Sequence, residues 1–210
     1  MRITLFGATG KTGRHVLRHA LEQGHYVRAY ARNPQNIQTT SDRLDIVTGE
    51  YTNTAAIASA IEGADVVIST LGPGKASPPD LMSFSAQSIV KAMSDNEVPR
   101  LIWMTGAGVK LPGDQFSLSR PIVRGLMKLV AASVLRDSEG AARVIQDSPV
   151  QWTIARAPIL ADAPSSGNIV ISTAPPKPKG VSREDIALFL LSEAEQNNWI
   201  NAAPFIGVSG

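Results

Sequence analysis

Three glycines near the start of the chain stand where a backbone could bind an anion. The stretch Gly7-Ala8-Thr9-Gly10-Lys11-Thr12-Gly13 follows a strand-like apolar run at 2–6 and opens a segment of helical period at 11–23. Glycines permit a sharp turn and a close approach of the backbone to a pyrophosphate, and a helix N-terminus offers unpaired N–H groups and a positive dipole end. The order strand, glycine turn, helix therefore predicts a dinucleotide-phosphate site at 7–13.

The tripeptide Gly10-Lys11-Thr12 also resembles the end of an ATP-binding P-loop, an interpretation that we reject. A P-loop needs a glycine five residues before Gly10, where this chain has Leu5. Only Ala8 and Thr9 separate Gly7 from Gly10, which leaves too little chain to wrap a β-phosphate. The turn therefore favours a dinucleotide over ATP.

The residues after the second expected strand bear on which dinucleotide fits. A site for NAD places a carboxylate about 20 residues past the glycines, where it binds the ribose 2′-hydroxyl. Here the strand at 26–30 ends in Ala31-Arg32-Asn33-Pro34, without an acid. Because a guanidinium can hold a 2′-phosphate through two charge-assisted hydrogen bonds, Arg32 predicts a preference for NADP(H).

Residue types that carry acid–base or nucleophilic chemistry are sparse. The chain has three tyrosines, Tyr26, Tyr30 and Tyr51, and none has a lysine four residues later, so a Tyr-x-x-x-Lys dyad is absent. All histidines lie within 15–25 and no nucleophile elbow is present, which disfavours a hydrolase triad. With no cysteine, thiolate chemistry is excluded.

A metal site is the remaining alternative for the histidines. His15 and His19 stand four apart on the first expected helix and could share a face. Two ligands do not make a site, and the sequence offers no carboxylate in an obvious third position. We therefore expect no metal.

The elements that would position these residues alternate along the chain. Short β-branched runs alternate with segments of helical period, which is typical of βαβ units and a parallel sheet. We expect strands near 2–6, 26–30, 44–48, 65–70, 100–105, 151–156 and 203–207, and helices near 11–23, 53–62, 81–95, 120–147 and 183–195. The pattern predicts an α/β fold: one domain over 1–210, with a doubly wound, mostly parallel Rossmann sheet and helices on both faces.

Three stretches rich in turn residues interrupt this alternation, and each follows an expected strand. They lie near 72–80, 106–119 and 159–180. Ligands of open α/β sheets bind beyond the carboxyl ends of the strands, so we expect these loops to form the walls of a substrate site.

Composition narrows the partners. The formal net charge is only +2, which is little for gripping a polyanion, so we expect no nucleic acid. No apolar run approaches the roughly 20 residues that a membrane span needs, and the chain starts directly with a strand rather than a leader. We expect a cytoplasmic protein without a membrane partner. The sequence leaves monomer and homodimer open.

Several motifs together resemble a known family. GATGKTG at 7–13, ARNP at 31–34, GADVVISTLG at 63–72, RLIWMTGAG at 100–108 and WTIARAP at 152–158 resemble the atypical short-chain dehydrogenases with NAD(P)-binding Rossmann domains. The resemblance covers essentially the whole chain. It points in particular to the group of flavin reductase/biliverdin-IXβ reductase and the NmrA-like proteins.

The resemblance implies a set of cofactor contacts, some close to the phosphates and some near the nicotinamide. Family members usually carry aspartate where Glu50 stands, and the reductases often have histidine where Ile159 follows Pro158. The implied contacts to the pyrophosphate are Gly7, Thr9, Gly10, Lys11, Thr12 and Gly13; to the 2′-phosphate, Arg32; to the adenine edge, Glu50 and Tyr51; along the adenosine and ribose, Thr70, Leu71 and Gly72; and near the nicotinamide, Thr105, Gly106, Ala157 and Pro158.

Two functions from different classes follow. The first is an NADPH-dependent reductase that passes hydride to a planar acceptor such as a flavin or quinone, which needs little acid–base help from the protein. Thr105, at the end of the fifth strand, is then the candidate hydroxyl that orients the carboxamide or the acceptor, or it only caps the strand. The alternative is a non-catalytic NADP(H)-binding redox sensor, as the NmrA-like branch suggests.

Overall fold

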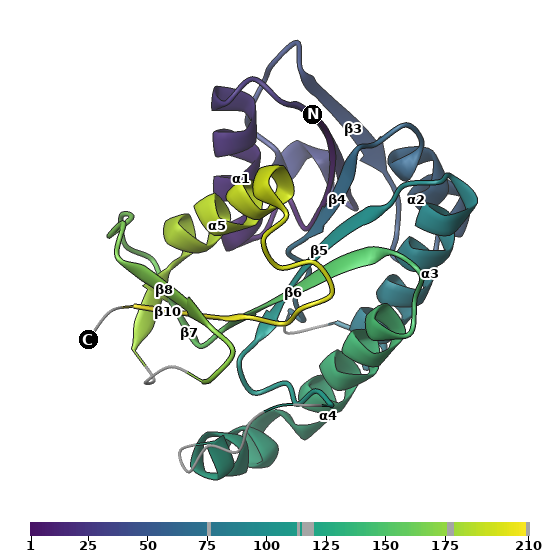
Figure 1. Cartoon of the computed structure of the whole chain (residues 1–210). Coiled ribbons are helices and arrows are strands. Elements are labelled where there is room, and N and C mark those ends of the chain that lie inside the picture. Colours follow the sequence, from purple (N-terminus) through teal and green to yellow (C-terminus); the bar gives the residue numbers. More distant parts are fainter. Residues whose placement is uncertain (75–76, 113, 115–119, 176–178, 209–210) are drawn as a thin grey trace.

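A twisted eight-stranded sheet forms the centre of the protein. The computed structural model describes residues 1–74, 77–112, 114, 120–175 and 179–208, without the side chains of 120–131 (Figure 1). The strand order is β3-β2-β1-β4-β5-β6-β10-β8. Its first six strands follow the Rossmann order, and β8 alone in this sheet runs antiparallel to its neighbour, β10. The strands are β1 (Arg2–Phe6), β2 (Tyr26–Ala31), β3 (Leu44–Thr48), β4 (Val66–Ser69), β5 (Arg100–Gly106), β6 (Gln151–Ala157), β8 (Ile169–Ser172) and β10 (Phe205–Val208).

Helices cover both faces of the sheet. α1 and α5 lie on one face, and α2, α3 and α4 lie on the other, which confirms the doubly wound α/β fold that the sequence predicts (Figure 1). Their bounds are α1 (Lys11–Glu22), α2 (Thr54–Ile61), α3 (Leu81–Asp95), α4 (Arg120–Gln146) and α5 (Arg183–Gln196), with a short 3₁₀ helix, η1, at Pro34–Asn36. Among the helices of the described residues, none combines the length and apolar character that a membrane span requires.

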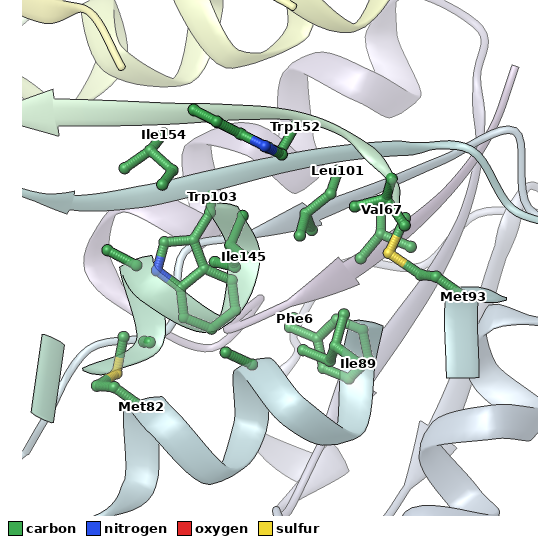
Figure 2. Close-up of a cluster of buried hydrophobic side chains, with 14 of the residues drawn as sticks. Phe6, Val67, Met82, Ile89, Met93, Leu101, Trp103, Ile145, Trp152 and Ile154 are labelled. Atoms are coloured by element: carbon green, nitrogen blue, oxygen red, sulfur yellow. The ribbon is translucent and has the colours of Figure 1, made fainter. Parts of the chain in front are cut away.

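The core is split into two apolar clusters, one on each face of the sheet. In β4, Val67 belongs to the cluster under α2, α3 and α4, while Val66 and Ile68 belong to the cluster under α1 and α5. The side chains of β4 alternate between these two clusters, so both faces of the strand are buried and neither is exposed to solvent. Figure 2 shows the first cluster, where side chains of the strands, among them Trp103, meet those of α3 and α4.

The strand order reverses at the turn that the sequence singled out. β1 is parallel to β2 on one side and to β4 on the other. The sheet is extended by β2 and β3 on the first side and by β4, β5 and β6 on the second, so the chain leaves β1 at Gly7 where the strand order reverses. Ligands of doubly wound folds bind at this switch point, outside the carboxyl ends of the strands.

The segment 159–180 is more structured than the sequence suggested. We expected one long loop, but it holds β7 (Ile159–Ala161) and β8 and reaches β9 (Gly180–Ser182). β7 and β9 form a separate two-stranded parallel sheet, while β8 joins the main sheet through β10. The expectation was wrong because these strands have only three or four residues, and their partners lie far away in the chain.

Candidate functional site

The glycine turn has the geometry of an anion site. Gly7 has φ of +84°, a left-handed conformation that favours glycine, and the N–H of Gly10 donates to the Gly7 carbonyl over 2.9 Å. A Cβ on Gly13 would lie 2.0 Å from that carbonyl oxygen, so only glycine lets α1 approach β1 this closely. Gly10 is the N-cap of α1, no side chain caps the helix, and its first turn has no acid. The N–H groups of the first turn of α1 are therefore available to a phosphate.

A cavity of about 240 Å³ opens beside this turn. It brings together half of the sixteen cofactor residues expected from the sequence, although these eight come from four separate segments. Those eight are Gly7, Thr9, Gly10, Arg32, Tyr51, Thr70, Leu71 and Gly72. A larger cavity, of about 440 Å³, lies at the amino ends of β1, β2 and β3, the edge opposite the turn, and we give it no cofactor role because Rossmann ligands bind at the carboxyl edge.

The other expected residues lie outside the cavity, in three groups. Lys11, Thr12 and Gly13 form the first turn of α1, and Glu50 is exposed just after β3. Thr105 and Gly106 end β5, next to Ala157 at the end of β6 and Pro158 after it, since Gly106 pairs with Ala157. The cavity thus covers the part of the site expected for the adenosine, and the part expected for the nicotinamide lies at β5 and β6.

Nine further residues line the cavity that the sequence analysis did not select as cofactor contacts. Gly74 and Ser77 belong to the expected wall 72–80, and the other seven are strand or helix residues that look like ordinary core positions in the sequence, so no motif could have revealed them. These seven are Phe6, Tyr30, Ala31, Ile57, Leu81, Ser85 and Ile89.

Tyr30 has a fixed role in this wall. Its hydroxyl donates to the backbone carbonyl of Glu50 over 2.8 Å. Burial, and then the charge of the Glu50 carboxylate, raise the pKa of Tyr30 to about 12, so the phenol stays protonated. Tyr51 packs edge-on against Phe84, with ring centroids 5.6 Å apart. Tyr26, the third tyrosine, is 57% exposed at the amino end of β2.

The chain after β5 is anchored to β6. The N–H of Ala107 donates to the carbonyl of Ala157 over 2.7 Å, and the buried Asp114 forms an ion pair with Arg156 at 2.6 Å. Thr105 is 8% exposed. The expected wall 106–119 is thus held at two points, while residues 113 and 115–119 of that prediction, like 75–76 and 176–178 of the other two loops, lie outside the described residues.

Lys11 connects the glycine turn to the segment after β7. Its ammonium binds the Asp162 carboxylate at 2.7 Å, and Arg183 binds the other oxygen of the same carboxylate. The hydrogen bond from Lys11 is the main reason that the pKa of Asp162 lies below its ordinary value. Sequence analysis missed this contact because 151 residues separate its two partners.

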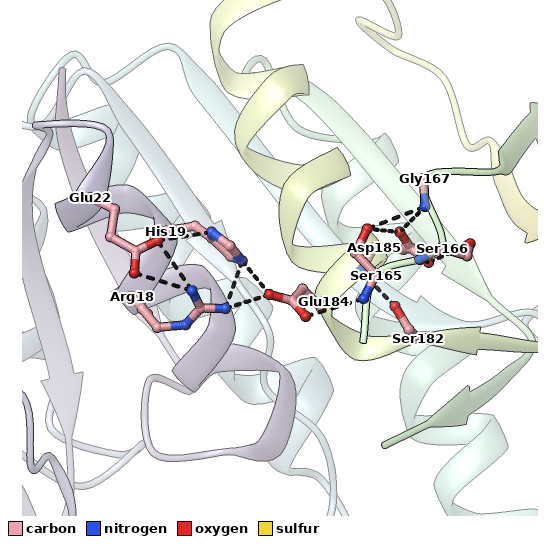
Figure 3. A network of polar contacts seen from close by, with 9 residues as sticks. All are labelled: Arg18, His19, Glu22, Ser165, Ser166, Gly167, Ser182, Glu184 and Asp185. Atoms are coloured by element: carbon pink, nitrogen blue, oxygen red, sulfur yellow. Dashed lines mark hydrogen bonds and ion pairs between the residues drawn. The ribbon is translucent and has the colours of Figure 1, made fainter. Parts of the chain in front are cut away.

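Two further carboxylates at the start of α5 hold the turn at 165–167 (Figure 3). Glu184 accepts from Arg18 over 2.5 Å and from the N–H of Ser165 over 3.2 Å. Asp185 is nearly buried, which by itself would raise its pKa, but hydrogen bonds from Ser165 and then from Ser166 and Ser182 lower the pKa to about 2. The turn after Asp162 is therefore fixed to α5.

The structure also places a carboxylate beside the two histidines of α1. Ligand atoms of His15, His19 and Glu184 lie within 4.8 Å of one another, which corrects the expectation that no acid completes the set. However, Arg18 donates to Glu184 and lies 2.9 Å from Nε2 of His19 (Figure 3). A cation would have to displace that guanidinium, so we assign no metal here.

Together, the Rossmann strand order, the uncapped glycine turn and the adjoining cavity define a dinucleotide-binding domain. The chain belongs to the NAD(P)H-binding family, whose pattern matches residues 7–197. This confirms the family resemblance that the motifs indicated.

Solved structures of similar proteins share the fold. A short-chain dehydrogenase/reductase of Veillonella parvula DSM 2008, in complex with NADP, is 21% identical with a TM-score of 0.82, over 100% of this chain and 95% of that chain. A Rossmann-fold NAD(P)-binding protein from Shigella flexneri is 24% identical with a TM-score of 0.78, over 100% and 94%. ChuY from Escherichia coli O157:H7, described as an anaerobillin reductase, is 20% identical with a TM-score of 0.79, over 98% and 96%.

One curated relative matches over a shorter stretch. The uncharacterised protein YwnB of Bacillus subtilis (strain 168) is 29% identical over 110 residues, which are 51% of this chain and 48% of that protein. The matched region thus spans about half the length of the curated relative.

Proposed function

We propose that this protein is an NADP(H)-dependent oxidoreductase that passes hydride to a planar acceptor such as a flavin or a quinone. The observation that carries the proposal is the cavity beside the glycine turn, which joins the turn, the carboxyl end of β4 and Arg32 in one space. In this assignment the adenosine fills the cavity, the pyrophosphate lies on the first turn of α1, and the nicotinamide extends toward the ends of β5 and β6. The similar structure in complex with NADP supports the choice of cofactor, and the similar reductase ChuY supports the reaction class.

Arg32 supports the choice of NADP(H) over NAD(H). It lies at the carboxyl end of β2, lines the cavity, is exposed, and has no hydrogen bond or ion pair within the described part of the chain. A guanidinium without a protein partner at this position can bind the 2′-phosphate through two hydrogen bonds without first losing another contact.

The positions of the tyrosines support a planar acceptor. Tyr30 and Tyr51 belong to the adenosine end of the site, and Tyr26 lies at the opposite edge of the sheet, so no tyrosine stands at the ends of β5 and β6. Flavins and quinones accept hydride by stacking on the nicotinamide, and solvent can supply the accompanying proton. The reaction converts NADPH, a proton and the oxidised acceptor into NADP⁺ and the two-electron-reduced acceptor, with Thr105 orienting the carboxamide or the acceptor.

An NADPH-oxidation screen tests this proposal. Loss of reduced nicotinamide absorbance is followed with flavins, quinones and small carbonyls, while calorimetry measures the affinities for NADPH and NADH. Turnover with a flavin or quinone, together with tighter binding of NADPH than of NADH, supports it. Tight NADPH binding without turnover for any acceptor would favour the redox sensor, and lack of binding to either dinucleotide would refute both.

A further inference from the structure

One buried hydroxyl in the wall of the cavity lacks a hydrogen-bond partner among the described residues. Ser85, on the second turn of α3, is 1% exposed, lines the cavity, and its Oγ has no hydrogen-bond partner within the described residues. Buried side-chain hydroxyls nearly always have a partner, and one without a partner in a native protein calls for an explanation.

The remaining hydroxyls of the cavity wall are either bonded within the protein or, in Thr9 and Tyr51, partly exposed and therefore able to bind water. Tyr30 donates to the Glu50 carbonyl over 2.8 Å, Thr70 donates to the carbonyl of Phe6 over 3.2 Å, and Ser77 accepts from an N–H of Gly74 over 2.7 Å. Those groups shape the protein. Ser85 is thus available to whatever fills the cavity.

The surroundings of Ser85 indicate the chemistry of that occupant. Ile57 and Ile89, at most 1% exposed, and Leu81 supply apolar wall to the same cavity, and Tyr51 supplies an aromatic ring. An apolar pocket with one hydroxyl suits a flat heteroaromatic ring that offers a polar edge, since its faces need apolar contact and one edge atom needs a hydrogen bond.

We infer that Ser85 donates a hydrogen bond to a ring nitrogen of the adenine and thereby positions the adenosine half of the cofactor. The inference rests on the proposed binding of a dinucleotide in this cavity and adds a residue that no sequence motif marks. In the free protein the hydroxyl has no partner among the described residues, and cofactor binding supplies one.

Fragments of the cofactor separate this role from others. Calorimetry measures the affinity of the wild type and of Ser85→Ala for NADPH, for 2′,5′-ADP, which retains the adenosine end, and for reduced nicotinamide mononucleotide, which lacks it. A hydrogen bond of ordinary strength corresponds to a loss of about fivefold. We expect that loss for NADPH and 2′,5′-ADP, and an unchanged affinity for the mononucleotide.

Ser88→Ala is the matched control. Ser88 lies one turn further along α3, outside the residues that line the cavity, and loses the same hydroxyl. It should bind all three ligands as the wild type does. Thermal unfolding without ligand adds a second readout: Ser85→Ala should be at least as stable as the wild type, because the substitution removes a hydroxyl that has no partner.

Three results would overturn the inference. Wild-type affinity of Ser85→Ala for 2′,5′-ADP would show that Ser85 binds only water, while the proposed function would stand. A lower melting temperature of the free variant, with equal losses for all three ligands, would make Ser85 structural. Failure of the wild type to bind either NADPH or 2′,5′-ADP would remove the proposed function and this inference together.

Discussion

Replacing Arg32 by alanine should convert a preference for NADPH into indifference between the two dinucleotides. Arg32 is exposed and unpaired in the described structure, so its removal breaks no internal contact and should leave the melting temperature unchanged. Its proposed partner, the 2′-phosphate, exists only in NADP(H). The substitution should therefore weaken NADPH binding and spare NADH.

The magnitude follows from the exposure of the site. Truncating one partner of a close, desolvated charge pair costs about 2–5 kcal/mol. Because Arg32 lies at a solvent-exposed rim, and Lys11 and Asn33 can partly compensate, the cost should fall at or somewhat below the lower end of that range. This corresponds to a loss of roughly tenfold to thirtyfold in NADPH affinity. Raising the salt concentration should likewise weaken wild-type NADPH binding more than NADH binding.

Calorimetric titration of both dinucleotides measures this effect. Arg136→Ala is the control, because it removes the same charge from an exposed position on α4 that lines none of the cavities described above. Arg32→Lys should fall between wild type and alanine, since it keeps the charge but loses the bidentate geometry. If Arg32→Ala weakens both dinucleotides equally, or neither, the assignment of the 2′-phosphate to Arg32 is wrong.

Four further substitutions probe the turn and its neighbours. Gly10→Val should fold, because Gly10 has an ordinary φ of −73° and its Cβ would lie 3.1 Å from the Gly7 carbonyl oxygen, a tight contact that a shift of a few tenths of an ångström relieves. The variant should nevertheless fail to bind NADPH by calorimetry, since the valine side chain would occupy space that the pyrophosphate needs. Gly13→Ala should lower the melting temperature even without ligand, because its Cβ would lie 2.0 Å from the Gly7 carbonyl oxygen. Asp162→Asn should raise NADPH affinity, by less than about fivefold, because it frees Lys11 for the pyrophosphate; an unchanged or lower affinity would speak against competition. Asp185 has its folded pKa lowered to about 2 from 3.8, so its contribution to stability is present above pH 3.8 and is lost as the pH falls toward 2; Asp185→Asn should flatten that part of the curve of melting temperature against pH.

The first six strands of the main sheet were predictable because each has a local signature. β4, for instance, is a β-branched run followed by a glycine-rich stretch, and its burial on both faces is what a parallel central strand requires. The segment after β6 lacks such a signature. β8 is defined by its pairing with β10, more than thirty residues later, and that pairing cannot be deduced from the four residues of β8 alone.

The candidate site shows the same division. The turn at 7–13 and Arg32 carry their chemistry in residue type and spacing, so the sequence indicated them directly. Ile57, Leu81 and Ser85 sit at core-like positions of α2 and α3, and only the fold shows that they face a cavity. The sequence therefore predicts contacts that depend on local backbone, but not those that depend on how helices from distant segments pack.

The arrangement of polar groups bears directly on how the proposed reaction obtains its proton. Tyr30 has a pKa of about 12 and already donates to the Glu50 carbonyl, so losing its proton would break a contact that holds the wall of the adenosine end. At the other end of the site, the ends of β5 and β6 offer Thr105, whose hydroxyl can orient a carbonyl but is too weak an acid to protonate one. A simple ketone needs a strong proton donor at the moment of hydride transfer, whereas a flavin or quinone delocalises the negative charge over its ring system and can take its proton from solvent afterwards. Placement of the tyrosines away from β5 and β6 therefore favours the delocalised acceptor within the proposed chemistry.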